Sequence, residues 1–216
     1  MSRIVLGVTG SVAAIRTPML VRRLLDQGHD VRVVATEPSL HFFDAAEFAQ
    51  SFETSARVLY RDHDEWPPTG YGIGAAVPHI EFRNWADLLV VAPLDANTLG
   101  KFALGLCDNF LTCLFRAWDF ASKPVILAPA MNTKMWEHPA TRRHLATLLG
   151  DHADSAPPES WALTEAATLF ARHAPRIVLV PPQVKTLACG EVGNGAMAEV
   201  VTIAQSVCKI LAAPDS

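Results

Sequence analysis

Short apolar segments recur along this chain, and stretches with helical spacing of apolar residues lie between them. The segments are Arg3–Val8, Val31–Ala35, Ala56–Tyr60, Leu88–Ala92, Val125–Ala128 and Ile177–Val180. Strands that are apolar on both faces are typical of a parallel sheet with helices on both sides. The pattern therefore predicts an α/β fold with a mostly parallel, fully covered sheet.

The intervening stretches predict helices. Their spacing is helical over Ser11–Gln27, Asp44–Phe52, Ala96–Trp118 and Pro139–Leu149. We expect residues 61–78, which are rich in proline and glycine, to form a loop. No linker divides the 216 residues, which favours a single domain over 1–216. Residues 151–176 are a possible insertion, either a surface segment or a modified entrance to the site, and 161–172 have room for an added helix. The glycine-rich residues 185–198 are expected to form a flap over the substrate.

Composition excludes several functional classes. The net charge is −4 without a basic block, which argues against nucleic acid as a partner. Apolar runs are far shorter than the roughly 18 residues of a membrane span, so no membrane association is expected. The N-terminus lacks the features of a secretory signal, which predicts a cytoplasmic protein. The four cysteines have no CxxC spacing and are expected to be free thiols, with no metal site.

Two loops at the carboxyl ends of strands carry polar chemistry. Gly10-Ser11-Val12 follows the first strand, where a glycine lets backbone approach a ligand and a helix start favours an anion such as phosphate. The full GxGxxG fingerprint is absent, so a simple turn is the alternative. Thr36 and Glu37 end the second strand, where a nucleotide could reach them. Asp95-Ala96-Asn97-Thr98 follows the fourth strand and is either a helix cap or a binding loop for a flavin.

A third loop, PAMNTKMW (129–136), follows the apolar run Val125-Ile126-Leu127. It places one carboxamide side chain, that of Asn132, among large apolar side chains at the carboxyl edge of the sheet, where α/β proteins bind ligands. Met131, Met135 and Trp136 have the spacing of a packed helix face, so packing is the alternative role for them.

The flap segment contains a single cysteine, Cys189, among several glycines. A flap that closes over a substrate and brings a thiol to it is the functional interpretation. The alternative is a glycine-rich surface connection.

Together, PLDANT, PAMNTKMW, the run His79-Ile80-Glu81-Phe82-Arg83 and the LACG…GNGAMAE flap resemble the homo-oligomeric flavin-containing cysteine decarboxylases, and within them phosphopantothenoylcysteine decarboxylase. The resemblance spans roughly residues 4–203 with the motifs in matching order. It implies a Rossmann-like (flavodoxin-like) three-layer sandwich and bound FMN. It also implies homotrimers, or assemblies of trimers, with active sites at subunit interfaces.

The resemblance also assigns roles to residues of this chain. His79 and Cys189 are expected to be catalytic, the first as base or proton shuttle and the second as proton donor. The substrate carboxylate is expected at Asn132. The residues expected to bind FMN are Gly10, Ser11, Val12, Thr36, Glu37, Asp95, Ala96, Asn97, Thr98 and Ala130. The residues expected to line the substrate, besides Asn132, are Thr186, Leu187 and Ala188.

The implied activity is that of a carboxy-lyase in coenzyme A biosynthesis. It is the FMN-dependent oxidative decarboxylation of the cysteine moiety of 4'-phosphopantothenoylcysteine to 4'-phosphopantetheine. Decarboxylation needs an electron sink that the thiol itself lacks, and flavin supplies it. Asn132 is neutral, so it can hold the carboxylate without ionic stabilisation that would oppose CO₂ release.

The chain departs from the family at Asn84, where relatives often have a second basic residue after Arg83. The sequence therefore specifies the reaction type more closely than it specifies the identity of the substrate. Two alternatives remain: a decarboxylase of a peptide's C-terminal cysteine that releases an enethiol, and a non-catalytic regulatory flavoprotein. The flap cysteine argues against the first, and the combination of His79, Asn132 and Cys189 argues against the second.

Overall fold

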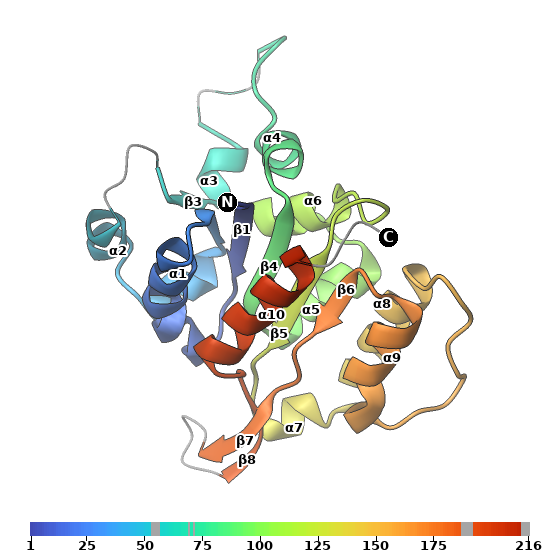
Figure 1. The fold of residues 1–216 in the computed structure, drawn as a ribbon. Coiled ribbons are helices and arrows are strands. Elements are labelled where there is room, and N and C mark those ends of the chain that lie inside the picture. Colours follow the sequence, from blue (N-terminus) through green and yellow to red (C-terminus); the bar gives the residue numbers. More distant parts are fainter. Residues whose placement is uncertain (53–56, 69, 71, 187–191, 213–216) are drawn as a thin grey trace.

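A six-stranded parallel sheet forms the centre of the protein, in the order β3-β2-β1-β4-β5-β6 (Figure 1). The computed structural model describes residues 1–52, 57–68, 70, 72–186 and 192–212. The strands are β1 (Arg3–Val8), β2 (Asp30–Ala35), β3 (Leu59–Arg61), β4 (Leu88–Leu94), β5 (Val125–Pro129) and β6 (Ile177–Leu179). This is the Rossmann strand order, so the prediction of a Rossmann-like parallel sheet is confirmed.

Alternate residues of each strand enter two different cores, as a sheet covered on both faces requires. On β1, Ile4, Leu6 and Val8 pack on one side, and Val5 packs on the other. All four side chains are fully buried. Continuous burial of this kind is why the strands read as uninterrupted apolar runs in the sequence.

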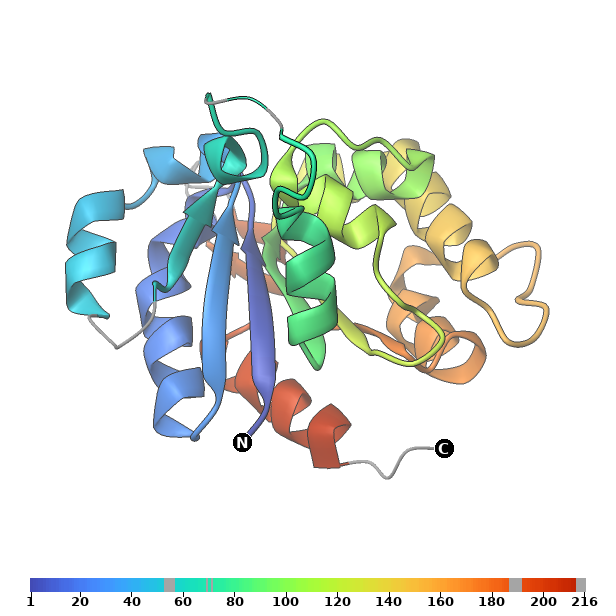
Figure 2. The ribbon, with the colours of Figure 1, turned by 90° about the horizontal axis from the view of Figure 1, so that it is seen from above.

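Helices cover both faces of the sheet (Figures 1 and 2). The face of Ile4 packs against α1 (Thr17–Asp26), α2 (Ala45–Ser51) and α10 (Val200–Ala212). The opposite face packs against α4 (Pro78–Trp85), α5 (Ala96–Leu104), α6 (Phe110–Arg116), α8 (Pro139–Asp151) and α9 (Ala166–His173). The shorter helical segments are η1 (Val12–Arg16), η2 (Glu37–His41), α3 (Asp62–Glu65), α7 (Thr133–Trp136) and η3 (Leu163–Glu165).

Two predicted long helices are each divided in the structure. The stretch Ser11–Gln27 begins as the 3₁₀ segment η1, and α1 starts only at Thr17 with Pro18 in its first turn. Proline suits a helix start because the missing N–H has no partner there in any case. The stretch Ala96–Trp118 is interrupted at Gly105, whose φ of 66° is left-handed and ends α5. Asn109 then caps α6.

The predicted loop over residues 61–78 is wrong at its start, because α3 occupies Asp62–Glu65. Asp64 begins this turn by accepting hydrogen bonds from Arg57 and from the backbone of Arg61. The helix expected within residues 151–176 is present as η3 and α9. Whether this segment is an insertion stays a prediction.

The segment between β6 and α10 contains a separate antiparallel hairpin of β7 (Gln183–Thr186) and β8 (Val192–Ala196). The hairpin projects beyond the edge of the main sheet, beside α7 (Figure 1). The expected flexible flap is therefore regular structure in its two arms, while residues 187–191 lie outside the described part of the chain. Among the described residues, no helix is long and apolar enough to span a membrane.

Candidate functional site

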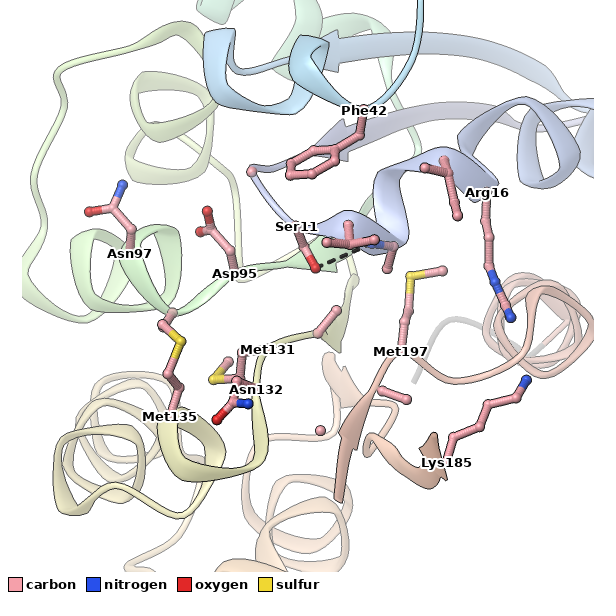
Figure 3. A pocket seen from close by; sticks show the side chains of 18 residues that line it. Ser11, Arg16, Phe42, Asp95, Asn97, Met131, Asn132, Met135, Lys185 and Met197 are labelled. Carbon is pink, nitrogen blue, oxygen red and sulfur yellow. Dashed lines mark hydrogen bonds between the residues drawn. The ribbon is translucent and has the colours of Figure 1, made fainter. Parts of the chain in front are cut away.

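A cavity of about 700 Å³ opens at the carboxyl ends of the central strands. It lies where the strand order reverses between β1 and β4, the position at which open α/β sheets bind ligands. Figure 3 shows the side chains around it. The lining residues are Gly10, Ser11, Val12, Ala13, Ile15, Arg16, Phe42, Asp95, Ala96, Asn97, Ala130, Met131, Asn132, Met135, Lys185, Gly195, Ala196 and Met197.

The first two loops meet at this cavity because Thr9 joins them. Its hydroxyl donates a 2.8 Å hydrogen bond to the carbonyl of Pro93 and accepts one of 2.7 Å from the backbone N–H of Asp95. Thr9 is completely buried. Because this buried hydroxyl acts as both donor and acceptor, it fixes the position of the two loops relative to each other.

Each of these loops is also shaped by its own capping residue. The Ser11 hydroxyl accepts from the backbone N–H of Ala13, at the start of η1. The Asp95 carboxylate accepts a 2.7 Å hydrogen bond from the backbone N–H of Thr98, at the start of α5. The capping interpretation of the Asp95 loop from the sequence is therefore correct, and both Ser11 and Asp95 also line the cavity.

The PAMNTKMW loop forms the wall opposite Ser11 (Figure 3). Asn132 caps α7, and its side-chain oxygen accepts a 2.8 Å hydrogen bond from the backbone N–H of Lys134. Trp136 is buried in the core, as expected for packing. Met135 is half exposed and lines the cavity together with Met131, so these two residues do more than fill the core.

The β7–β8 hairpin closes one side of the cavity through Lys185 and Gly195. The backbone N–H of Met131 donates a 2.9 Å hydrogen bond to the carbonyl of Gly195. This bond ties the hairpin to the PAMNTKMW loop. The position of the hairpin and the shape of the cavity wall are thereby linked.

Two cations at the cavity share one carboxylate. Glu199 accepts from Arg16 Nη1 at 2.8 Å and from Lys185 Nζ at 2.5 Å, and also from Gln183 Nε2 at 2.9 Å. The hydrogen bonds from Lys185 and Gln183, with the charge of Arg16, lower the pKa of Glu199 to about 2. The cluster links η1, the hairpin and the start of α10 at the cavity rim.

Some predicted site residues lie away from the cavity lining. Thr98 is buried in the first turn of α5, and the Thr36 hydroxyl donates to the carbonyl of Val8 at the edge of the sheet. Glu37 is exposed and forms a 3.2 Å ion pair with Arg61. His79 lies at the start of α4 and does not line the cavity of its own chain. For Thr186 only the backbone is described, and Leu187, Ala188 and Cys189 lie outside the described residues.

The cavity suits a small-molecule ligand with both apolar and polar parts. Its size lies in the range of about 300–1,000 Å³ for small-molecule and cofactor sites. Alanine and methionine side chains offer apolar contact, while Asp95, Asn97 and Asn132 supply polar groups. A methyl group on Gly10 would lie 2.7 Å from Pro38 Cβ and 3.2 Å from Asp95 Oδ2, so there is no room for a side chain at this position. Within the described residues, no cluster of acidic, histidine and cysteine side chains is suited to a metal ion.

Comparison with known proteins agrees with this geometry. The model of the family described as flavoprotein matches residues 1–212. The chain belongs to the flavoprotein family.

Relatives within this family are similar over nearly the whole chain. The chain is 47% identical to a phosphopantothenoylcysteine decarboxylase of Oryza sativa subsp. japonica over 95% of this chain and 79% of that protein. A solved PPC decarboxylase mutant complexed with pantothenoylaminoethenethiol is 44% identical, with a TM-score of 0.78 over 98% of this chain and 99% of the other. The FMN binding protein AtHal3 is also 44% identical, with a TM-score of 0.73 over 97% and 96%.

Several lining residues of this flavoprotein escaped the sequence prediction. Arg16 and Lys185 belong to no motif. Both contact Glu199, which is 183 residues from Arg16 and 14 residues from Lys185 in the sequence. Phe42 reaches the cavity from the turn after η2, and nothing in its local sequence points there. Thr9, which joins the first two loops without lining the cavity, was within reach of prediction, because a polar residue at the end of an otherwise apolar strand needs a buried partner.

Proposed function

We propose that this flavoprotein is a phosphopantothenoylcysteine decarboxylase, a carboxy-lyase of coenzyme A biosynthesis. In this proposal it removes the carboxyl group of the cysteine moiety of 4'-phosphopantothenoylcysteine as CO₂, which leaves 4'-phosphopantetheine. The observation that carries the proposal is the 47% identity to the rice enzyme of that name over 95% of the chain. The solved relative in complex with pantothenoylaminoethenethiol supports the same substrate class.

FMN is the cofactor in this proposal, supported by the family and by the similarity to AtHal3. Bound FMN supplies a two-electron redox centre that serves as the electron sink for decarboxylation. Gly10, Ser11 and Val12, the loop Asp95–Asn97 and Ala130 line the cavity and would hold FMN there. Thr36, Glu37 and Thr98 are further proposed contacts of FMN. Thr36 and Thr98 are hydrogen-bonded to Val8 and Asp95, next to these two loops.

Asn132 binds the substrate carboxylate in the proposed reaction. The residue lies at the cavity on a loop fixed by the start of α7, so its carboxamide has a defined position. A neutral amide holds the carboxylate by hydrogen bonding and does not stabilise its charge as strongly as a cation would, which favours departure of CO₂. Thr186, Leu187 and Ala188 are proposed to line the substrate, and Cys189 to donate the final proton.

His79 accepts or transfers a proton at the substrate thiol. In each active site this His79 belongs to a second copy of the chain. The support for this is that His79 lies outside the cavity of its own chain, so a site that uses it is completed across a subunit interface. Val12, Ile15 and Met19 form an exposed apolar strip on η1 and α1 next to the cavity. Apolar surface of this kind favours association. The proposed assembly is a homotrimer or a group of trimers in the cytoplasm.

The test is product identification by mass spectrometry. The purified protein is supplied with FMN and incubated either with 4'-phosphopantothenoylcysteine or with a peptide ending in cysteine. Loss of CO₂ alone from the first substrate, giving the saturated thiol, is the expected result. Loss of CO₂ and two hydrogens from the peptide would instead indicate an enethiol-forming decarboxylase. A protein that binds FMN but changes neither substrate would contradict the catalytic proposal.

A Cys189→Ser variant separates the two halves of the proposed reaction. It is expected to lose CO₂ from the substrate but to release the oxidised enethiol, because the final protonation is missing. Cys208→Ser is the matched control, since Cys208 is an exposed thiol on α10. The saturated thiol formed at the wild-type rate by Cys189→Ser would refute the role of Cys189 as proton donor.

A further inference from the structure

The side chain of Glu65 contacts His79 through both of its carboxylate oxygens. Oε1 lies 2.5 Å from Nδ1 of the His79 ring, and Oε2 accepts a 3.1 Å hydrogen bond from the His79 backbone N–H. The two residues come from different elements, Glu65 from the end of α3 and His79 from the first turn of α4. Neither the motifs nor the resemblance points to Glu65.

Glu65 is strongly buried, whereas His79 is partly accessible. The Glu65 side chain is 4% exposed and the His79 side chain 24% exposed. A buried carboxylate is costly unless its oxygens are hydrogen-bonded or paired with charge. Within the described residues, both groups hydrogen-bonded to this carboxylate belong to His79, which compensates its burial.

The position of Glu65 is set by α3 as a whole. Asp62 Oδ1 accepts a 3.1 Å hydrogen bond from the backbone N–H of Phe110, which anchors α3 to the start of α6. Asp64 accepts from both terminal nitrogens of Arg57 at 2.8 and 2.6 Å. Each acidic residue of the turn therefore has a separate partner, and two of these contacts hold α3 without involving His79.

We propose that Glu65 is a positioning residue that fixes the His79 ring with its proton on Nδ1 and its Nε2 available for the proton transfer of the reaction. An ionised carboxylate can only accept hydrogen bonds, so the facing Nδ1 must be the protonated nitrogen of a neutral imidazole. The bond to the backbone N–H of the same residue also aligns the carboxylate with the ring. This inference rests on the proposed function, in which His79 takes part in catalysis.

The arrangement gives His79 two properties that a free histidine lacks. Nε2 is the unprotonated nitrogen, so it can accept a proton from the substrate thiol. When it does, the carboxylate lies next to the positive imidazolium and stabilises it. Cys113, on α6, is within electrostatic reach of the same carboxylate, but burial foremost raises the pKa of its thiol to about 11 and keeps it neutral.

Replacement of Glu65 by glutamine tests the proposal through the identity of the protonated nitrogen. The backbone N–H of His79 is always a donor, so the single amide oxygen of glutamine must face it. The amide NH₂ then faces Nδ1, which has to become an acceptor. Glu65→Gln is therefore expected to invert the tautomer, with the proton moving to Nε2, while side-chain volume is retained.

The measurement is nitrogen NMR of ¹⁵N-histidine-labelled protein at a pH where His79 is neutral, with its signals assigned from a His79→Gln variant. The wild type is expected to show protonated Nδ1, and Glu65→Gln protonated Nε2. The matched control is Glu81→Gln, the same chemical change at an exposed position of α4, which is expected to leave the His79 signals in place. A wild-type His79 with its proton on Nε2, or an unchanged tautomer in Glu65→Gln, would overturn the proposal.

Steady-state kinetics supply the second readout. Glu65→Gln is expected to lower kcat on the order of 10²-fold with KM within about 3-fold, because the wrong nitrogen faces the substrate while the cavity is intact. Glu81→Gln is expected to retain wild-type kcat. If the wild type decarboxylates nothing, the proposed function fails, and the NMR result still decides the role of Glu65. An inverted tautomer with unchanged kcat would refute the catalytic part of the inference.

Discussion

The backbone N–H of Met131 donates a 2.9 Å hydrogen bond to the carbonyl of Gly195, and this contact joins the β7–β8 hairpin to the loop that carries Asn132. Gly195 has a φ of 143°, a conformation that is essentially restricted to glycine. A methyl group there would also overlap the carbonyl oxygen of Met131. The hairpin can lie this close to the PAMNTKMW loop only because position 195 has no side chain.

Gly195→Ala is therefore expected to destabilise the protein by roughly 1–3 kcal/mol and to weaken FMN binding. Both effects follow from displacement of the hairpin away from the cavity. Urea unfolding measures the first, and quenching of FMN fluorescence on titration measures the second. Gly150→Ala is the control, since a methyl group there meets nothing within 4 Å and replaces a helical glycine. Equal effects of the two substitutions would contradict a specific role of Gly195.

Thr9→Val tests the link between the first two loops. Valine keeps the shape of threonine but loses the hydrogen bonds to Pro93 and Asp95. We expect a loss of about 1–3 kcal/mol in the free energy of unfolding, because the backbone N–H of Asp95 is left without its acceptor. FMN affinity should fall as well, since both loops line the cavity.

The comparison for Thr9→Val is Thr147→Val, which removes a hydroxyl bonded to the carbonyl one turn earlier on the exposed side of α8. Its effect on unfolding is expected to stay within about 0.5 kcal/mol. Wild-type FMN affinity in Thr9→Val would show that the two loops hold their positions without this hydroxyl.

The central strands and the three cavity loops could be predicted because their signals are local. Each buried strand is apolar along its length, and each loop follows a strand directly, so parallel topology brings Ser11, Asp95 and Asn132 to one edge. The helix boundaries were less predictable. Gly105 and Pro18 are compatible with helical spacing around them, and only the backbone geometry shows that they end or begin a helix.

Contacts between distant segments could not be predicted from a single sequence. Glu65 lies in a stretch whose prolines and glycines favour a loop, and its partner His79 is 14 residues away on another helix. Arg16 and Glu199 are 183 residues apart. Such pairs depend on how helices pack on the sheet, and local residue patterns carry no signal for them.

Acidification should reveal the contribution of the Glu199 cluster to stability. Its hydrogen bonds and neighbouring cations lower the pKa of Glu199 to about 2 in the folded protein, below the ordinary value of 4.5. The folded state therefore holds the ionised form more strongly than the unfolded state does. This stabilisation is complete above about pH 4.5 and is lost as the pH falls towards 2.

Glu199→Gln is expected to lower the melting temperature by about 1–3 °C between pH 5 and 7, a modest effect because the cluster is largely solvent-accessible. The difference from the wild type should shrink progressively below pH 4.5. Thermal unfolding followed by circular dichroism across this range measures it. Glu159→Gln, at an exposed loop position, is the control and should follow the wild type. A difference that stays constant down to pH 3 would contradict the assigned pKa.

Asn132→Asp separates the structural role of this residue from its proposed role in substrate binding. Aspartate can still accept the hydrogen bond from the backbone N–H of Lys134, and it caps helices as well as asparagine does. The fold of the loop should therefore be retained. The added negative charge repels the substrate carboxylate, and at a few ångströms this costs a few kcal/mol even with substantial screening. We expect kcat/KM to fall by about 10²-fold or more.

Binding of the product supplies the decisive comparison, since 4'-phosphopantetheine has no carboxylate. Asn132→Asp is expected to bind the product with wild-type affinity while it binds the substrate much more weakly. Isothermal titration of both ligands measures the difference, and Gln50→Glu provides the same change of charge on the exposed side of α2. Equal weakening of substrate and product binding would place the carboxylate elsewhere in the cavity. The charge at position 132 would then affect both ligands alike, although only the substrate has a carboxylate.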